Sequence, residues 1–386
     1  MNKIIWISAA VLSVAACAKN EVVPVNSGEN QEITFNVAPK TKAAPDPDPD
    51  PDPEPKPEPE PKPEPEPKKE AFSTNNVFAS WAYYLPTGTD WDDKSDKPEN
   101  ETYPKEYISG ATIVNNANTE GKWKCEGKSY YWPKNGTLTF FAYSLNKGDL
   151  TLEGENSKFS CRPDAGISGQ INMFDNPNTD FLVAEIAKNK TENVKTHFTE
   201  GVPTLFHHKL SKIVFNVKAG EYKRTSFSLK SIQFKNIGCF GVYNQIPEGF
   251  SYGLVSKLYN PYYSKNNQGQ SVISTPAVVN SVENEIFIPQ TFADNATIEV
   301  VYTITTKVLN SDDVVETVTK PIKLNTLFPT KYDNSDPQKV IGGGWEMGKK
   351  YTINLTFTLD EILWDPAVQD WEGVNIGTDT KPIIVG

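Results

Sequence analysis

Histidine is the residue with which this chain could best perform acid–base or metal chemistry, and the sequence has three: His197, His207 and His208. Neighbouring side chains on a strand point to opposite faces, so the adjacent pair cannot bind one metal ion together. The sequence contains no H-E-x-x-H, G-x-S-x-G, P-loop or C-x-x-C motif. The glycine-rich "IGGGWEMG" flanks a strand pattern and is typical of a turn. We therefore expect no enzyme, no metal site and no cofactor.

Carboxylates form a second candidate group, at Asp90, Asp92, Asp93 and Asp96. Carboxylate oxygens are the ligands that Ca²⁺ prefers, but this spacing follows no known calcium loop, and a solvated acidic loop is expected. The eight tryptophans could instead form a surface that stacks on glycans. Trp132 and Trp364, however, lie close to prolines at strand ends, where packing in a core is the default expectation.

Cys17 is the residue with the clearest chemistry. It follows Lys3 and an apolar run over residues 4–16, a layout that is typical of a secretory signal peptide and too short to be a permanent membrane span. "SVAAC" resembles the lipobox of bacterial lipoproteins, in which the cysteine becomes the first mature residue and is acylated. An ordinary signal peptide with an incidental cysteine is the alternative. Each buried acyl CH₂ contributes about 0.8 kcal/mol, so a lipidated Cys17 would anchor the chain to the outer membrane.

The residues that follow Cys17 bear on location. "AKNE" places an acidic residue close behind the cysteine and is similar to the surface-export signals of Bacteroidetes lipoproteins. This favours the cell surface over the periplasmic face. Three cysteines remain in the body, Cys125, Cys161 and Cys239, and an odd number is not a disulfide framework. Buried thiols are expected, with a single disulfide as the alternative.

Residues 45–67 alternate proline with charged residues, nine of them acidic. Proline fixes φ at every second position and the carboxylates repel one another, which predicts an extended polyproline II rod of roughly 70 Å. A disordered linker is the alternative. Most of the formal net charge of −11 lies in this rod, and Arg162 and Arg224 are the only arginines. A nearly neutral body gives no reason to expect nucleic acid as a partner.

The body is rich in short segments of β-branched and aromatic residues, and none sustains a helical period, so the fold is expected to be all-β. In "KYTINLTFTL" the residues Tyr351, Ile353, Leu355, Phe357 and Leu359 share one face at period two, as in a sandwich. A chain of 386 residues exceeds what one hydrophobic core usually serves, so two domains are expected. The expected strands are 77–85, 136–144, 179–187, 210–219, 227–237, 283–290, 296–309 and 350–359.

Several of these segments together resemble a known family. "YYWPKNGTLTFFAYS", "TDFLVAEI", "VPTLFHHKLSKIVFNV" and "WEMGKKYTINLTFTLDEILWDPAVQDW" are similar to the fimbrillin, or Mfa-like, family of Bacteroidetes, as is the start of the chain from Cys17. The resemblance implies two transthyretin-like β-sandwich domains in a subunit that polymerises into surface fimbriae, or caps, anchors or decorates them. It also implies that a trypsin-like protease removes the first strand, and that a strand of a neighbouring subunit fills the groove.

This resemblance, with the segments above, divides the chain into a signal peptide (1–16), an N-terminal tether with the candidate removable strand (17–44), a proline-rich linker (45–70) and two sandwich domains (71–205 and 206–386). The removable strand is "EITFNV", with Ile33, Phe35 and Val37 facing inward. Lys42 and Lys69 are the candidate cleavage sites. Some family members are cut after arginine, and this chain has no arginine in that region. The candidate donor strand near the C-terminus has Val374, Ile376, Thr378, Thr380 and Ile384 on one face.

The sequence leaves open whether "EITFNV" packs into the body. A stiff rod resists turning back, which favours residues 32–37 as part of the tether and a lipid-anchored anchor or accessory subunit. The expected function is that of a fimbrial subunit whose partners are other subunits, bound by strand exchange, and the outer membrane, bound through the lipid. The alternative is a stand-alone surface lipoprotein that binds a glycan or host ligand.

Overall fold

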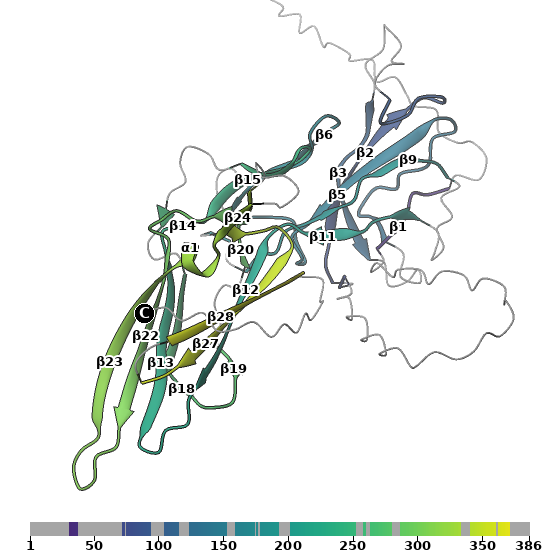
Figure 1. Ribbon diagram of the computed structural model, residues 1–386. Helices are drawn as coiled ribbons and strands as arrows, with labels where there is room; N and C mark the ends of the chain where they lie inside the picture. Colours follow the sequence, from purple (N-terminus) through teal and green to yellow (C-terminus); the bar gives the residue numbers. More distant parts are fainter. Residues whose placement is uncertain are drawn as a thin grey trace, which may run out of the picture.

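The structure is a computed structural model (Figure 1) and describes these residues: 31–37, 72–73, 75–93, 104–115, 123–152, 159–173, 175–176, 178–192, 201–251, 258–259, 263–279, 286–332, 340–359 and 362–370. The described part is all-β apart from one turn of helix, α1 (Leu324–Leu327). The sequence-based expectations for Cys17, Lys42, Lys69 and the tail residues Val374, Ile376, Thr378, Thr380 and Ile384 lie outside the described residues.

The first sheet has nine strands in the order β10-β1-β4-β3-β2-β5-β8-β11, with β9 beside β5. It curls on itself, because three strands lie between β1 and β5 in this order and yet the ring centroids of Phe35 in β1 and Phe140 in β5 are 5.8 Å apart. The curl encloses an apolar core. The strands are β1 (Phe35–Asn36), β2 (Phe78–Leu85), β3 (Lys105–Asn115), β4 (Trp123–Cys125), β5 (Thr137–Ser144), β8 (Leu182–Ala184), β9 (Ala187–Lys190), β10 (Val202–Pro203) and β11 (Phe206–His208).

A second sheet covers the outer face of this curl. It contains β6 (Ser160–Arg162), β7 (Gly166–Asn172), β15 (Phe240–Gln245) and β16 (Glu248–Ser251), in the order β16-β15-β7-β6. All eight residues of β2 are therefore buried: Trp81 and Tyr83 pack toward the second sheet, whereas Phe78, Ala82 and Tyr84 pack inside the curl. Burial on both faces explains why β2 reads as a continuous apolar run.

The expected division between residues 205 and 206 does not follow the strand pairing. β15 pairs with β7 through five residues, from Phe240 opposite Asn172 to Asn244 opposite Ser168. Tyr243 is fully buried in the same core as Trp81. Residues 240–251 thus complete the sandwich of the first half, because the apolar face of β7 is covered by strands that come much later in the chain.

The C-terminal sandwich is built from two further sheets (teal to yellow in Figure 1). In one of them β12 and β27 run parallel over eight paired residues. The facing sheet has the order β18-β13-β22-β23. The strands are β12 (Ser211–Ala219), β13 (Thr225–Lys235), β18 (Tyr263–Val272), β19 (Ala277–Val278), β20 (Ile286–Phe287), β22 (Thr297–Thr306), β23 (Val314–Lys323), β27 (Lys349–Phe357) and β28 (Ile362–Asp370).

The period-two pattern of "KYTINLTFTL" is confirmed up to Phe357. Tyr351, Ile353, Leu355 and Phe357 are all buried in the C-terminal core, but Leu359 is 50% exposed. β27 ends at Phe357, so the next residue of the pattern no longer has a sheet behind it. The remaining described strands form three two-stranded sheets: β14 (Ile237–Gly238) with β17 (Leu258–Tyr259), β21 (Gln290–Thr291) with β26 (Gly344–Trp345), and β24 (Thr330–Tyr332) with β25 (Val340–Gly342).

Each predicted strand segment contains at least one observed strand. Over residues 179–187 the single expected strand is in fact β8 followed by the start of β9. Within the ranges that the structure describes, we find no helix of the length and hydropathy that a membrane crossing requires.

Candidate functional site: the groove that holds the first strand

Residues 31–37 lie between β10 on one side and, on the other side, β4 and the segment 130–132, with which they form backbone hydrogen bonds. On one side, Ile33 N donates to Tyr130 O (2.8 Å) and Trp132 N donates to Gln31 O (3.1 Å). On the other side, Val202 N donates to the Thr34 carbonyl at 2.7 Å, and a similar bond joins residues 204 and 36 at 2.9 Å. The segment thus occupies a slot in a sheet, which we call the first-strand groove.

The side chains of this segment complete the core inside the curl. Ile33 is 1% exposed and Phe35 2%, while Val37 is half-buried against the same core. The expectation that residues 32–37 belong to the tether is therefore wrong. Burying each of the two larger side chains stabilises the fold by about 1.5–3 kcal/mol, whereas doubling the length of the closing loop costs only about 0.6 kcal/mol.

Gly201 allows the backbone of β10 to approach the first strand closely. Its φ is +137°, a conformation that L-residues rarely adopt. A Cβ atom at this position would lie 3.1 Å from both Phe35 C and Thr34 O. A glycine is thus required where the chain enters β10 and pairs in parallel with β1.

A polar contact fixes the start of the first strand. The Glu32 carboxylate pairs with Lys124 on β4 and accepts a hydrogen bond of 2.7 Å from Ser129 Oγ. Burial alone would raise the pKa of Glu32, but the hydrogen bonds from Lys124 and Ser129 and the charge of Lys124 outweigh it and lower that pKa. We call Glu32, Lys124 and Ser129 the carboxylate clamp.

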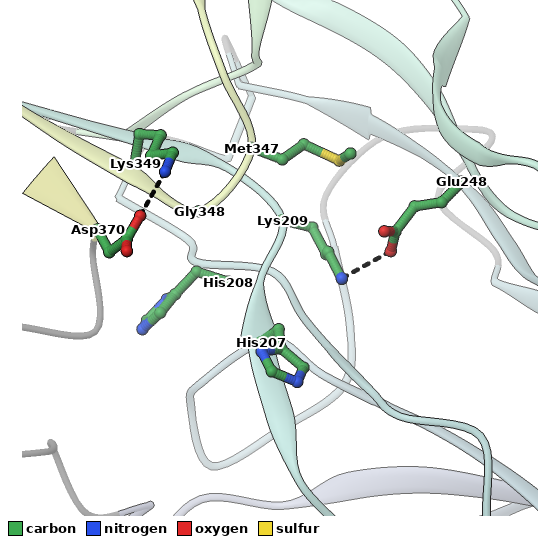
Figure 2. A pocket seen from close by; sticks show the side chains of 8 residues that line it. All are labelled: His207, His208, Lys209, Glu248, Met347, Gly348, Lys349 and Asp370. Carbon is green, nitrogen blue, oxygen red and sulfur yellow. Dashed lines mark hydrogen bonds and ion pairs between the residues drawn. The ribbon is translucent and has the colours of Figure 1, made fainter. Parts of the chain in front are cut away.

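His207 and His208 lie in a pocket elsewhere in the molecule, whereas His197 lies outside the described residues. Figure 2 shows His207, His208 and Lys209 beside Glu248 of β16 and the pair formed by Lys349 and Asp370. His207 and His208 contact different carboxylates, Glu185 at 3.0 Å and Asp180 at 2.6 Å, as expected for neighbours on a strand. Among the described residues, no three His, Cys, Asp or Glu side chains gather as a metal site.

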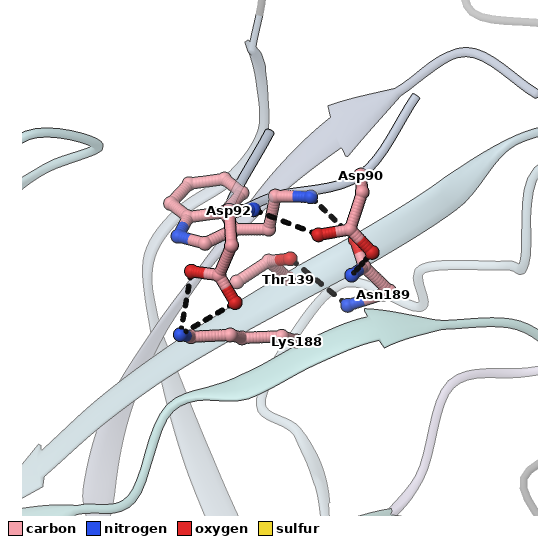
Figure 3. Close-up of polar contacts among 6 residues, drawn as sticks. Asp90, Asp92, Thr139, Lys188 and Asn189 are labelled. Atoms are coloured by element: carbon pink, nitrogen blue, oxygen red, sulfur yellow. Dashed lines mark hydrogen bonds and ion pairs between the residues drawn. The ribbon is translucent and has the colours of Figure 1, made fainter. Parts of the chain in front are cut away.

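The acidic loop is attached to β9 (Figure 3). Lys188 Nζ donates to both carboxylate oxygens of Asp92, at 2.7 and 3.0 Å, and Asn189 Nδ2 donates to Asp90 at 2.7 Å. Asn189 N in turn donates to Thr139 Oγ1 on β5. These two carboxylates thus hold a loop to the sheet, while Asp96 lies outside the described residues.

Of the five tryptophans whose side chains are described, Trp91 is half-buried and four are core residues: Trp81, Trp123, Trp132 and Trp345. The expectation for Trp132 is confirmed, and the side chain of Trp364 lies outside the described residues. Four buried indoles offer no face to a glycan.

The three body cysteines Cys125, Cys161 and Cys239 are free thiols. Burial raises the pKa of each to about 12, so they are mostly protonated and unreactive at neutral pH. The single disulfide considered as an alternative is absent.

The comparisons with known proteins agree with this architecture. The family model described as fimbrillin-like matches residues 86–371. The chain belongs to the fimbrillin-like family. In this fimbrillin-like protein the matched range starts after the first strand and the proline rod. The first-strand groove, whose occupant lies before that range, is therefore formed mostly by residues inside it.

One solved structure shares the fold of this fimbrillin-like chain. A fimbrial protein from Bacteroides vulgatus is 17% identical, with a TM-score of 0.55 over 76% of this chain and 92% of the other. The tip fimbrial protein Mfa3 from Porphyromonas gingivalis, with a C-terminal truncation, is 10% identical, with a TM-score of 0.31 over 77% of this chain and 94% of the other. A search of curated proteins gives no match. Family membership supports a fimbrial and adhesive role at the cell surface.

Sequence reasoning proposed the first strand but missed what receives it. The groove residues come from three distant stretches, around Trp123, Tyr130 and Val202. A charge pair between Glu32 and a lysine of the body could have indicated the groove. The sequence does not show which of its several lysines forms that pair.

Proposed function

We propose that the chain is a structural, anchor or accessory subunit of surface fimbriae, held to the outer membrane through a lipidated Cys17 while it is uncut, and that it assembles by exchange of its first strand after proteolysis. The observation that carries the proposal is the burial of Ile33 and Phe35 in a slot with strands on both sides. Loss of residues 31–37 would leave unpaired backbone groups and open apolar pockets. A strand from another subunit satisfies both needs.

The proposed cleavage at Lys42 and that at Lys69 would both free the first strand, but they would leave different products. Lys56 and Lys62 each precede a proline, and trypsin-like proteases cut such bonds poorly. Cutting after Lys42 leaves the rod on the body, whereas cutting after Lys69 removes it. In both products Phe72 stays with the body, where it packs against the groove core. The proposed protease therefore releases the first strand without loosening the strand that follows.

The tail with Val374, Ile376, Thr378, Thr380 and Ile384 is the proposed donor. It follows β28, an edge strand whose last residue, Asp370, pairs with Lys349 at the rim of the pocket in Figure 2. Its alternation of apolar and polar residues matches that of the first strand. A strand that leaves from the edge of a sheet is free to reach a neighbouring subunit.

The test is to isolate the protein from its native cell surface and to determine its N-terminus and intact mass. A chain that begins after Lys42 or Lys69 and forms SDS-resistant ladders supports strand exchange. An intact acylated Cys17 on a chain that joins ladders supports the anchor role. A chain that is uncut on the native cell surface, and that stays monomeric once trypsin has removed its first strand, would refute the proposal.

A further inference from the structure

The carboxylate clamp lies at one end of the first-strand groove and is the charged contact of the first strand with the body. Lys124 and Glu32 are 26% and 25% exposed, so water screens their pairing only partly. The other contacts of residues 31–37 described above are backbone hydrogen bonds and apolar packing. Only the clamp distinguishes one position along the strand from another by charge.

This distinction determines register. Alternate residues of a strand share a face, so a strand that slides by two residues presents the same face to the groove and keeps its backbone ladder. The clamp is lost in such a slide, and Lys124 then faces the groove without its carboxylate. A partly buried charge without its partner is destabilising. A strand with a carboxylate at the place of Glu32 is therefore favoured over its own shifted registers.

The residues after the clamp define three apolar positions: the first, second and third positions are those of Ile33, Phe35 and Val37. A strand that replaces residues 31–37 must fill at least the first two and supply the carboxylate next to the first. Within residues 371–386, the acidic side chains are those of Glu372 and Asp379. Each can meet Lys124 with the tail running in either direction.

Only one of these four arrangements fills the apolar positions. In the direction of the first strand, Glu372 brings Gly373 to the first position and Asp379 brings Pro382 to the second. In the opposite direction, Glu372 at the clamp brings Gln369, a residue of β28, to the second position. These three arrangements place glycine, proline or glutamine at an apolar position of the groove. None of these residues fills that position as an apolar residue of a hydrogen-bonded strand would.

The fourth arrangement fits. With Asp379 at the clamp and the tail running opposite to the first strand, Ile376 and Val374 take the second and third positions, and Thr378 offers its methyl group to the first. We propose that Lys124 and Ser129 select the incoming strand by its carboxylate, and that the tail of a second copy enters antiparallel to the departed first strand with Asp379 in the clamp. The inference rests on the strand exchange proposed above. Such a strand would pair antiparallel with β10 and parallel with β4, and both ladders are sterically allowed.

The experiment uses the full-length chain, treated with trypsin, and follows the rate at which SDS-resistant ladders form. Asp379→Asn removes the carboxylate, and we expect about tenfold slower ladder formation, the loss expected for one hydrogen-bonded charge contact. Glu372→Gln is the matched control, because it removes the other carboxylate of the same tail, and its rate should equal that of the wild type. Neither change creates or removes a trypsin site.

The clamp itself is tested with the pair Glu32→Gln and Lys124→Gln, which keeps a hydrogen-bonding partner for residue 32 in the uncut chain. We expect this variant to form ladders as slowly as Asp379→Asn, and the addition of Asp379→Asn to cause no further loss. A zero-length carbodiimide cross-link between Lys124 and Asp379, identified by mass spectrometry of the wild-type ladder, tests the direction.

The outcomes separate the two proposals. If the wild-type chain forms no ladder, strand exchange is wrong and this inference fails with it. If the wild type forms ladders and Asp379→Asn forms them at the same rate, strand exchange stands and selection by the clamp is overturned. A cross-link from Lys124 to Glu372 in place of Asp379 would overturn the proposed direction.

Discussion

The ring of Phe72 stacks on the ring of Phe206, with centroids 4.9 Å apart and planes 15° apart. Phe72 is the first described residue after the proline rod, and Phe206 begins β11 at the far end of the curled sheet. The body is therefore fastened immediately beyond Lys69. Residues from Phe72 onward therefore stay with the body after the proposed cleavage, whereas residues 31–37 precede both cleavage sites.

Phe72→Ala should destabilise the chain by roughly 1–3 kcal/mol, because the ring is partly buried and contacts other aromatic rings. Denaturant unfolding measures the effect. The same loss should remain after trypsin treatment, because Phe72 stays on the body. A loss that disappears after cleavage would show that residue 72 leaves with the linker.

Phe35→Ala should cost about 3–5 kcal/mol in the uncut chain, since the ring is fully buried and meets Phe78 and Phe140 edge-on. Val37→Ala, at a half-buried position of the same segment, should cost distinctly less. Unfolding curves of the two variants give the comparison. Equal small effects would contradict the placement of Phe35 in the core.

Gly201→Val should loosen the first strand, because a side chain at a φ of +137° is strained and its Cβ atom would press on the backbone of Thr34 and Phe35. We expect faster release of the N-terminal segment in limited trypsin digestion, followed by mass spectrometry. Gly249, whose Cβ would have no neighbour within 4 Å, provides the control substitution Gly249→Val. Identical digestion rates for both variants would argue against the close approach.

The pH dependence of stability should contain a contribution from Glu32. Its pKa in the folded chain is below the usual 4.5, so its stabilisation is complete above that value and is lost as the pH falls through the lower folded pKa. Glu32→Gln should therefore be less stable than the wild type at neutral pH, and the difference should vanish in acid. Unfolding at several pH values measures the difference, which isolates Glu32 from other carboxylates. A constant difference would mean that the clamp does not depend on charge.

The thiols should resist alkylation in the folded chain, because burial raises the pKa of Cys125, Cys161 and Cys239 to about 12. Mass spectrometry after iodoacetamide treatment at pH 8 should show slow labelling of these three residues, and rapid labelling in denaturant. Rapid labelling of Cys239 in the native chain would contradict its burial.

The sequence by itself determined the all-β class and the strands with a clear period. In β27 the residues Tyr351, Ile353, Leu355 and Phe357 point into one core, and local alternation suffices to predict this because the side chains of a strand alternate between its two faces. The family resemblance was also present in the sequence, since it rests on the same core segments.

Only the tertiary structure decided the fate of the first strand and the limits of the sandwiches. "EITFNV" has the same alternation whether it lies in a tether or in a sheet, and its burial depends on Trp123, Tyr130 and Val202, which are distant in sequence. The stiffness of the rod argued for a tether, but the free energy of burying two large side chains exceeds the cost of closing the loop. Likewise, β15 pairs with β7 because an apolar sheet face must be covered. A local sequence pattern does not predict which distant strand covers that face.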